Sequence, residues 1–219
     1  MKKYLFLLFL LSSFAGESFS QKDSIASKES GRFQLGMRST ISAFSDARSL
    51  GMGAGGQFRI RFGSRMNSDW FGDYITTDIG GLAKRTDYHI GWSVLYYPLN
   101  CHGTKGKFTP YILAGHCFDW TNVQKNGFYT DYNMPQSRFS SAVQSGIGTH
   151  YNLTDNFDVS LTAQYMIHLG SEIRTIIFYN DAIGGKDIKI EKDGLGLDGH
   201  LLINLSMNVY IAKLWGNKK

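Results

Sequence analysis

Histidines and serines are the residues of this chain that could perform nucleophilic chemistry. Such a site needs a Ser or Thr nucleophile, a histidine base and an orienting carboxylate or amide within hydrogen-bond reach. The candidate pairs are His89 with Ser93 and His150 with Ser145. On an extended strand the first pair is about 13 Å apart, and the second pair lies on opposite faces. The sequence therefore predicts no catalytic residue and no enzyme, with a lipid-modifying enzyme as the minor alternative.

The six histidines also predict no metal site and no cofactor. They are scattered over separate segments, without a His-x-His pair or a carboxylate cluster at ligand spacing. Two glycine-rich stretches, 51–56 and 145–148, are similar to phosphate-binding loops. A P-loop also requires a following Lys-Ser/Thr pair and a helix, and neither is there. We therefore interpret the histidines as single residues and the glycines as relief of crowding in strands.

Alternation of apolar and polar residues with a period of two recurs eight times and predicts eight β-strands. The clearest case is 157–169, where Phe157 to Leu169 alternate with Asp158 to His168. The face of 70–80 is undefined because either choice exposes an aspartate, and 107–118 is apolar on both faces. The predicted strands are 32–42, 52–63, 70–80, 87–97, 107–118, 139–151, 157–169 and 195–213.

Lysine and glutamate are missing from the cores of these predicted strands, although the chain has 14 lysines and 4 glutamates. A barrel in water would be expected to carry such residues on its outer face. We therefore predict that the apolar strand face meets lipid. The soluble alternative is a periplasmic lipocalin-like barrel, whose apolar face would point inward.

The N-terminus predicts export. Lys2 and Lys3 precede the apolar run 4–11, and Ser18 and Ser20 supply the small residues that a signal peptidase needs before Gln21. Cleavage there leaves a formal charge of +4, because Lys+Arg falls from 23 to 21 and Asp+Glu from 18 to 17. A mildly basic chain without a clustered basic face gives no support to nucleic-acid binding.

The connections between strands divide into two sets. If the mature N-terminus is periplasmic, the links 64–69, 98–106 and 152–156 are periplasmic, and 43–51, 81–86, 119–138 and 170–194 lie on the other side. The two longest links then share one side, as in bacterial outer-membrane barrels, which have short periplasmic turns and longer external loops. Cys101 falls in a periplasmic turn and Cys117 near the far end of the next strand, so we predict two unpaired thiols.

The chain from Gly31 to Trp215 resembles the small eight-stranded outer-membrane barrels of the OmpA/OmpX type. Its last strand is similar to the segment that the barrel insertion machinery recognises, through Met207, Val209, Ile211 and Trp215. The resemblance implies a closed antiparallel eight-stranded transmembrane up-and-down β-barrel, an all-β fold surrounded by outer-membrane lipid. The expected organisation is a signal peptide (1–20), a flexible segment (21–30), the barrel (31–215) and a periplasmic tail (216–219).

An eight-stranded barrel has an interior just wide enough for side chains to fill it. Buried charges there must be paired, so we predict a hydrogen-bond and salt-bridge network that plugs the lumen. Its predicted members are Arg38, Gln57, Arg59, Arg61, His89, Gln144, His150, Asp158, Gln164, His168, Asp198, His200 and Asn204.

Aromatic residues near the strand ends predict a girdle at the lipid interface. A carbohydrate-stacking surface is the alternative, and the aromatic loop 126–133 is its best candidate. The predicted girdle residues are Trp70, Phe71, Tyr88, Trp92, Tyr96, Tyr97, Tyr151, Phe157 and Trp215.

Two classes of function follow from this pattern. The first is a structural or interaction protein that presents loops 119–138 and 170–194 to a protein or glycan partner, for adhesion or envelope integrity. The second is a transport barrel whose lumen forms a narrow pore or holds a small ligand. We favour the first.

Overall fold

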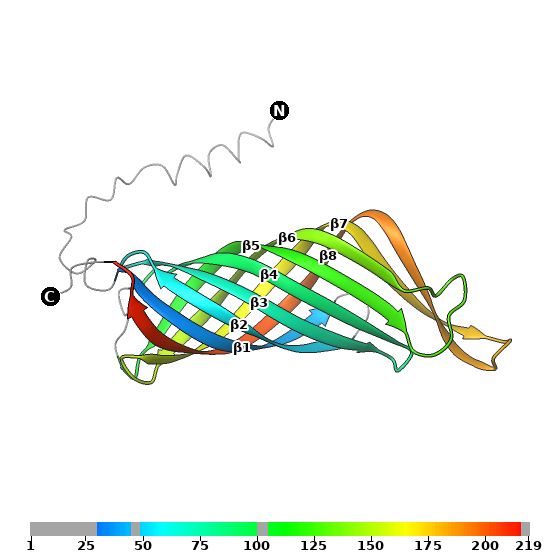
Figure 1. Ribbon diagram of the computed structural model, residues 1–219, viewed down its shortest axis with the longest axis horizontal. Coiled ribbons are helices and arrows are strands. Elements are labelled where there is room, and N and C mark those ends of the chain that lie inside the picture. Colours follow the sequence, from blue (N-terminus) through cyan, green and yellow to red (C-terminus); the bar gives the residue numbers. More distant parts are fainter. Residues whose placement is uncertain (1–29, 45–48, 100–104, 216–219) are drawn as a thin grey trace, which may run out of the picture.

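The computed structural model describes residues 30–44, 49–99 and 105–215 and shows a closed eight-stranded barrel (Figure 1). Each strand pairs antiparallel with the next, and β8 closes the barrel on β1. The described residues contain no helix that is long and apolar enough to span a membrane. The predicted fold class is confirmed. The strands are β1 (Arg32–Phe44), β2 (Leu50–Arg61), β3 (Met66–Ile79), β4 (Ala83–Tyr96), β5 (Phe108–Lys125), β6 (Gln136–Asn152), β7 (Phe157–Asn180) and β8 (Gly185–Lys213).

Both ends of the predicted domain scheme lie outside the described residues: the signal peptide with the segment 21–29, and the tail 216–219. Cys101 lies outside them as well. Cys117 is a buried free cysteine. β1 begins and β8 ends at the same end of the barrel, which we call the periplasmic end, because the longer connections lie at the opposite end (Figure 1).

Side chains alternate between the lumen and the outer surface along every strand, as the period of two predicts. On β7, Asp158 and Ser160 are buried in the lumen, whereas Leu161 and Tyr165 are exposed on the outside. On β1, Met37 is 77% exposed while its neighbour Arg38 is buried. The polar face is therefore the inner face, and the apolar face is the outer one.

The structure settles the two faces that the sequence left undefined. On β3 the lumen receives Phe71, Asp73 and Ile75, and on β5 it receives Cys117 and Asp119. These sets mix apolar and charged side chains because the lumen contains apolar layers as well as polar ones. One layer consists of Phe71, Ile75, Cys117, Ala142, Met166 and Leu202.

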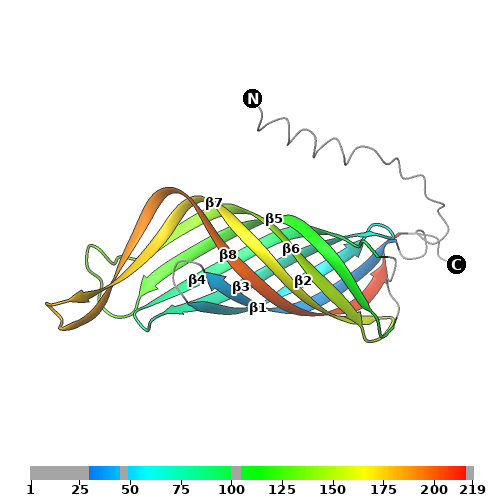
Figure 2. The same cartoon turned by 180° about the vertical axis from the view of Figure 1, so that it is seen from behind.

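The long external links are shorter than predicted, because the strands extend into them. Link 119–138 shrinks to 126–135, between β5 and β6, and link 170–194 shrinks to a turn at 181–184 between β7 and β8. Both β7 and β8 therefore run far beyond the other strands as one hairpin (Figures 1 and 2). The lysines and glutamates of the predicted link 170–194 lie on these extended strands.

Candidate functional site

Eleven of the thirteen side chains predicted for the lumen are buried. Arg61 is half-buried, and the side chain of Asp198 lies outside the described ones. The buried members are Arg38, Gln57, Arg59, His89, Gln144, His150, Asp158, Gln164, His168, His200 and Asn204. They form three groups at successive heights, which we take from the periplasmic end outward.

Asp158 is the centre of the periplasmic group. Its carboxylate accepts hydrogen bonds from Gln34 Nε2 at 2.8 Å, Asn208 Nδ2 at 2.9 Å and Ser160 Oγ at 3.1 Å. The guanidinium of Arg59 lies 3.4 Å away and completes a buried ion pair. This carboxylate thus has one charged partner and three neutral donors.

His150 belongs to the same group and does not have the partner suggested by the sequence. Its Nδ1 lies 2.5 Å from Ser160 Oγ, and its Nε2 lies 2.8 Å from the hydroxyl of Tyr97. Ser145 faces outward, away from this network, as expected from its position on the opposite face of β6. Both ring nitrogens of His150 are therefore engaged in lumen hydrogen bonds.

An ion pair that crosses over β2 dominates the middle of the lumen. Arg38 Nε lies 3.0 Å from Asp73 Oδ1, and both side chains are almost fully buried. The strand between them contributes Gly55, and a Cβ there would collide with the Asp73 carboxylate. Arg38 also lies over the ring of Phe71, 4.5 Å from its centroid. A glycine on the lumen face is thus what allows this pair to form.

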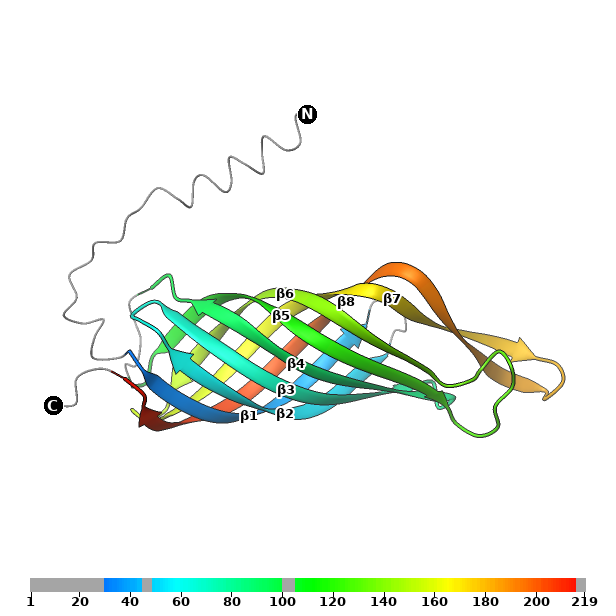
Figure 3. The same cartoon turned by 45° about the horizontal axis from the view of Figure 1, so that its top comes forward.

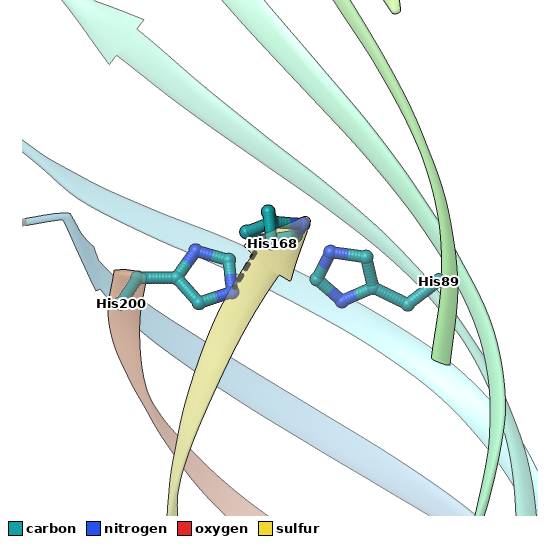
Figure 4. Close-up of side chains that lie close together, drawn as sticks. All are labelled: His89, His168 and His200. Carbon is teal, nitrogen blue, oxygen red and sulfur yellow. Dashed lines mark hydrogen bonds between the residues drawn. The ribbon is translucent and has the colours of Figure 1, made fainter. Parts of the chain in front are cut away.

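The third group brings three histidines together, on the periplasmic side of the buried Arg85–Asp87 ion pair. His168 Nε2 and His200 Nε2 are 3.4 Å apart, and the rings of His89 and His200 are 5.6 Å apart between centroids (Figure 4). Asp119 lies beside two of these rings, 3.3 Å from His89 Nε2 and 3.2 Å from His168 Nδ1. The interpretation of these histidines as single, scattered residues is wrong, because closure of the barrel brings β4 close to β7 and β8.

An apolar layer covers the histidine group on the external side. Its members come from the external ends of five strands, and they are Ile79, Ala83, Val123, Ile173, Ile188 and Ile190. Two cavities lie deeper in the barrel, with volumes of about 40 Å³ at the periplasmic mouth and about 10 Å³ in the middle. Since one water needs roughly 10–15 Å³, they have room for a few waters and about one water, respectively.

Outside the barrel, the β7–β8 hairpin is braced by the connection 126–135. Asp187 accepts hydrogen bonds from Lys125 Nζ at 2.7 Å, Tyr132 Oη at 2.8 Å and Asn180 Nδ2 at 3.1 Å. These partners, Lys125 first, hold the pKa of the Asp187 carboxyl below its ordinary value. The backbone of Ile190 also donates to the carbonyl of Tyr132 at 3.0 Å. The two long connections therefore form one unit, seen side by side in Figure 3.

Apolar side chains are exposed on this braced unit. Phe128 is 93% exposed, and Tyr179 and Ile183 are 65% and 61% exposed. Ile176, Ile177 and Met134 are exposed as well. We call this unit, residues 126–135 with 172–192, the external platform.

Comparison with solved structures places this architecture among known folds. A major outer-membrane protein from Thermus thermophilus is similar with a TM-score of 0.53 and 11% identity, covering 82% of this chain and 99% of that chain. The chain has the fold of an outer-membrane β-barrel. Neisserial surface protein A is also similar, with a TM-score of 0.49 and 14% identity, covering 82% of this chain and 97% of that chain. OprG from Pseudomonas aeruginosa has a TM-score of 0.46 and 16% identity, covering 84% of this chain and 98% of that chain. No protein-family model matches the sequence, and no curated protein does.

The outer surface of the barrel has the features that this fold uses in lipid. Phe33, Phe58, Trp70 and Trp92 make a continuous row across β1 to β4, with successive ring centroids 5.9, 5.9 and 6.4 Å apart. Aromatic rows of this kind suit the membrane interface. Two of the predicted girdle residues are buried and do not lie on this outer surface.

Tyr97 and Phe71 point into the lumen instead of toward lipid. Tyr97 is 1% exposed. Its hydroxyl accepts a hydrogen bond from Asn67 Nδ2 and contacts His150. Phe71 lies under Arg38. The sequence missed both, because Tyr96-Tyr97 and Trp70-Phe71 are adjacent aromatic pairs, and only one member of each pair can face outward on a strand.

Proposed function

We propose that this protein is an outer-membrane barrel that conducts nothing and presents its external platform to a protein partner. The braced β7–β8 hairpin carries this proposal. A free loop of this length would lose considerable conformational entropy on binding. Here the hydrogen bonds to Asp187 and the packing of Tyr132 against Phe178 hold the binding surface in place before a partner arrives.

The filled lumen supports the non-conducting part of the proposal. Polar networks occupy its periplasmic and middle sections, and the apolar layer around Ile79 and Ile188 covers its external end. Water cannot hydrogen-bond to these apolar side chains, so an ion would lose part of its hydration there. The buried Arg85–Asp87 ion pair fills the lumen beside them, since Arg85 is paired with Val123 in the sheet. A narrow pore is the alternative function, and it requires this layer to open.

Exposed apolar and aromatic side chains support a protein partner for the platform. Phe128, Tyr179 and Ile183 gain free energy when a partner removes them from water, at roughly 25 cal/mol per Å² of apolar surface. Aromatic anchors surrounded by polar residues are typical of protein interfaces. A glycan would instead require ordered polar groups beside the rings.

The first experiment is gel mobility of protein from purified outer membranes, with and without boiling in detergent. A compact band that shifts on boiling supports a closed barrel in lipid, and an unshifted band in the periplasmic fraction would overturn the proposed location. Planar-bilayer recordings of the folded protein, with a porin as positive control, then test the lumen. We expect no conductance steps, and regular steps would favour the transport alternative.

The platform is tested by a photo-crosslinking amino acid placed at Ile183 or Phe128 in intact cells. A matched control carries it at Leu161, which is exposed on the lipid-facing surface. We expect a discrete protein adduct from the two platform positions and none from the control. Folded barrels that give no adduct at either platform position would refute the interaction role.

A further inference from the structure

We propose that His89, His168 and His200 form a binding site for a divalent transition-metal ion of the zinc class inside the barrel. The site is independent of the proposed function of the platform. It lies between the apolar layer that contains Met166 and Leu202 and the apolar layer that contains Ile188.

The geometry of the three rings is close to that of a metal site. They come from β4, β7 and β8, and their exposed fractions are 0%, 1% and 1%. One nitrogen from each ring lies within 4.8 Å of the other two. Zn–N bonds of about 2.0–2.1 Å in a tetrahedron place two ligand nitrogens about 3.4 Å apart. The Nε2 atoms of His168 and His200 are 3.4 Å apart (Figure 4).

The surroundings of the rings match the usual second layer of a metal site. A ligating histidine normally donates its other ring N–H to a carboxylate or another oxygen. Asp119 is in position to accept from His168 Nδ1 at 3.2 Å and from His89 Nε2 at 3.3 Å. Ser42 Oγ lies 3.4 Å from His200 Nδ1. These contacts leave His168 Nε2 and His200 Nε2, with one ring nitrogen of His89, as the three metal ligands.

The ring of His89 is otherwise poorly compensated. Within the described part of the chain, neither ring nitrogen of His89 makes a hydrogen bond of good geometry, although the ring is fully buried. If His168 and His200 donate through Nδ1, their Nε2 lone pairs face each other. A cation between the rings binds both lone pairs and a nitrogen of His89, whereas a direct His168–His200 hydrogen bond gives nothing to the His89 ring.

Nearby charges are compatible with a cation. Asp87, His89 and Asp119 also have ligand atoms within 4.8 Å of one another. Asp87 is already paired with Arg85, whose Nε lies 3.1 Å from its carboxylate, so Asp119 is the carboxylate that faces the histidines. Arg138 lies 3.7 Å from Asp119 and donates at 3.0 Å to the carbonyl of Ser171, so its guanidinium is shared with another acceptor. The Asp119 carboxylate therefore remains available to orient the imidazoles.

The donor set selects the class of metal. Imidazole nitrogens suit zinc, copper, nickel and cobalt, whereas magnesium and calcium prefer oxygen ligands. Three histidines and one further position for water or a carboxylate oxygen are typical of tetrahedral zinc. Zinc and its spectroscopic substitute cobalt are therefore the probes.

The test uses the untagged mature barrel folded in detergent in the presence of Zn²⁺, dialysed, and analysed for metal by mass spectrometry. Co²⁺ loading provides the visible absorption of a tetrahedral site. H168N and H200N remove ligands. D119N removes the orienting carboxylate, for which we expect a 10- to 100-fold loss of affinity. H150N is the matched control, since His150 is also a buried lumen histidine, and gel mobility verifies that each variant folds.

We expect one equivalent of zinc in the wild type and in H150N, and none in folded H168N or H200N. If H168N or H200N does not fold, D119N and the cobalt spectrum of the wild type decide. If the folded wild type retains no metal, the proposed site is overturned, and His168 and His200 are joined only by a direct hydrogen bond. Equal retention by wild type and H200N would mean adventitious ions only, with the same consequence.

Discussion

The ion pair between Arg38 and Asp73 allows a quantitative test of how the lumen is stabilised. Within the described residues, the Asp73 carboxylate has no hydrogen-bond donor of good geometry, so the guanidinium 3.0 Å away is its main compensation. The change R38M keeps most of the apolar stem that packs over Phe71 and removes only the charged group. It therefore leaves a buried carboxylate without its partner.

Removing one partner of a buried ion pair costs about 3–5 kcal/mol. We expect R38M to lower the free energy of unfolding by that amount. The double variant R38M/D73L, which replaces the pair by apolar side chains of similar size, should return to within about 1 kcal/mol of the wild type or exceed it. R59M is the comparison, because Asp158, the partner of Arg59, keeps three neutral hydrogen-bond donors. We therefore expect R59M to lower the free energy of unfolding by a smaller amount, about 1–3 kcal/mol.

The assay is urea unfolding of barrels folded into lipid vesicles, followed by tryptophan fluorescence and by gel mobility on the same samples. The midpoints are compared at a common slope. A loss below about 1 kcal/mol for R38M, well under the range for a broken buried pair, would refute the argument. So would a double variant no more stable than R38M, because the cost would then arise from packing and not from the unpaired carboxylate.

Three further outcomes follow from single positions. G55A should abolish or strongly weaken folding, because its Cβ would collide with Asp73. G56A should fold normally, because its Cβ would meet only one atom, at 3.8 Å. The heat-shifted band on a gel reports the folding of both variants. Because the pKa of Asp187 is lowered in the folded protein, its contribution is complete above the ordinary value of 3.8 and is lost as the pH falls below it. Protease resistance of the hairpin should therefore be constant from about pH 7 to 5 and decline below about pH 4. D187N should be cleaved faster than the wild type from about pH 7 to 5, and the difference should shrink as the pH falls. Equal cleavage of both at neutral pH would contradict the brace. Cys117 should resist a maleimide in the folded barrel and react after unfolding, as peptide mass spectrometry would show, because its thiol is buried; rapid labelling of the folded protein would place it elsewhere.

The sequence predicted the number of strands and most of their faces because one face is apolar and the other polar. On β7, Leu161 and Tyr165 could only face lipid if Asp158 faced the lumen. The same logic failed on β5, whose lumen face mixes Leu113 and Cys117 with Asp119. A filled lumen accepts apolar layers, so the composition of a segment alone does not identify its inner face.

The histidine group could not be predicted, because it depends on how the closed sheet is staggered. His168 and His200 lie on paired strands, and His168 is opposite Asp198, two residues from His200. His89 is on β4, separated from β7 by two strands in one direction. Its approach to the other rings occurs across the lumen, and no spacing in the sequence encodes that distance.

The external platform shows how a local irregularity of the backbone couples the barrel to its outer surface. The β7–β8 ladder shifts register between Ser171 and Ile173, and Gly170 just before it has a φ of 155°, which residues with side chains rarely adopt. Bulges bend a strand pair and increase its twist. The hairpin bends at this level (Figure 2), so that Ile173 and Ile188 cover the mouth of the lumen. The same bend carries Asp187 to Lys125. One irregularity therefore both closes the lumen and fixes the platform, which is why the two features occur together in this chain.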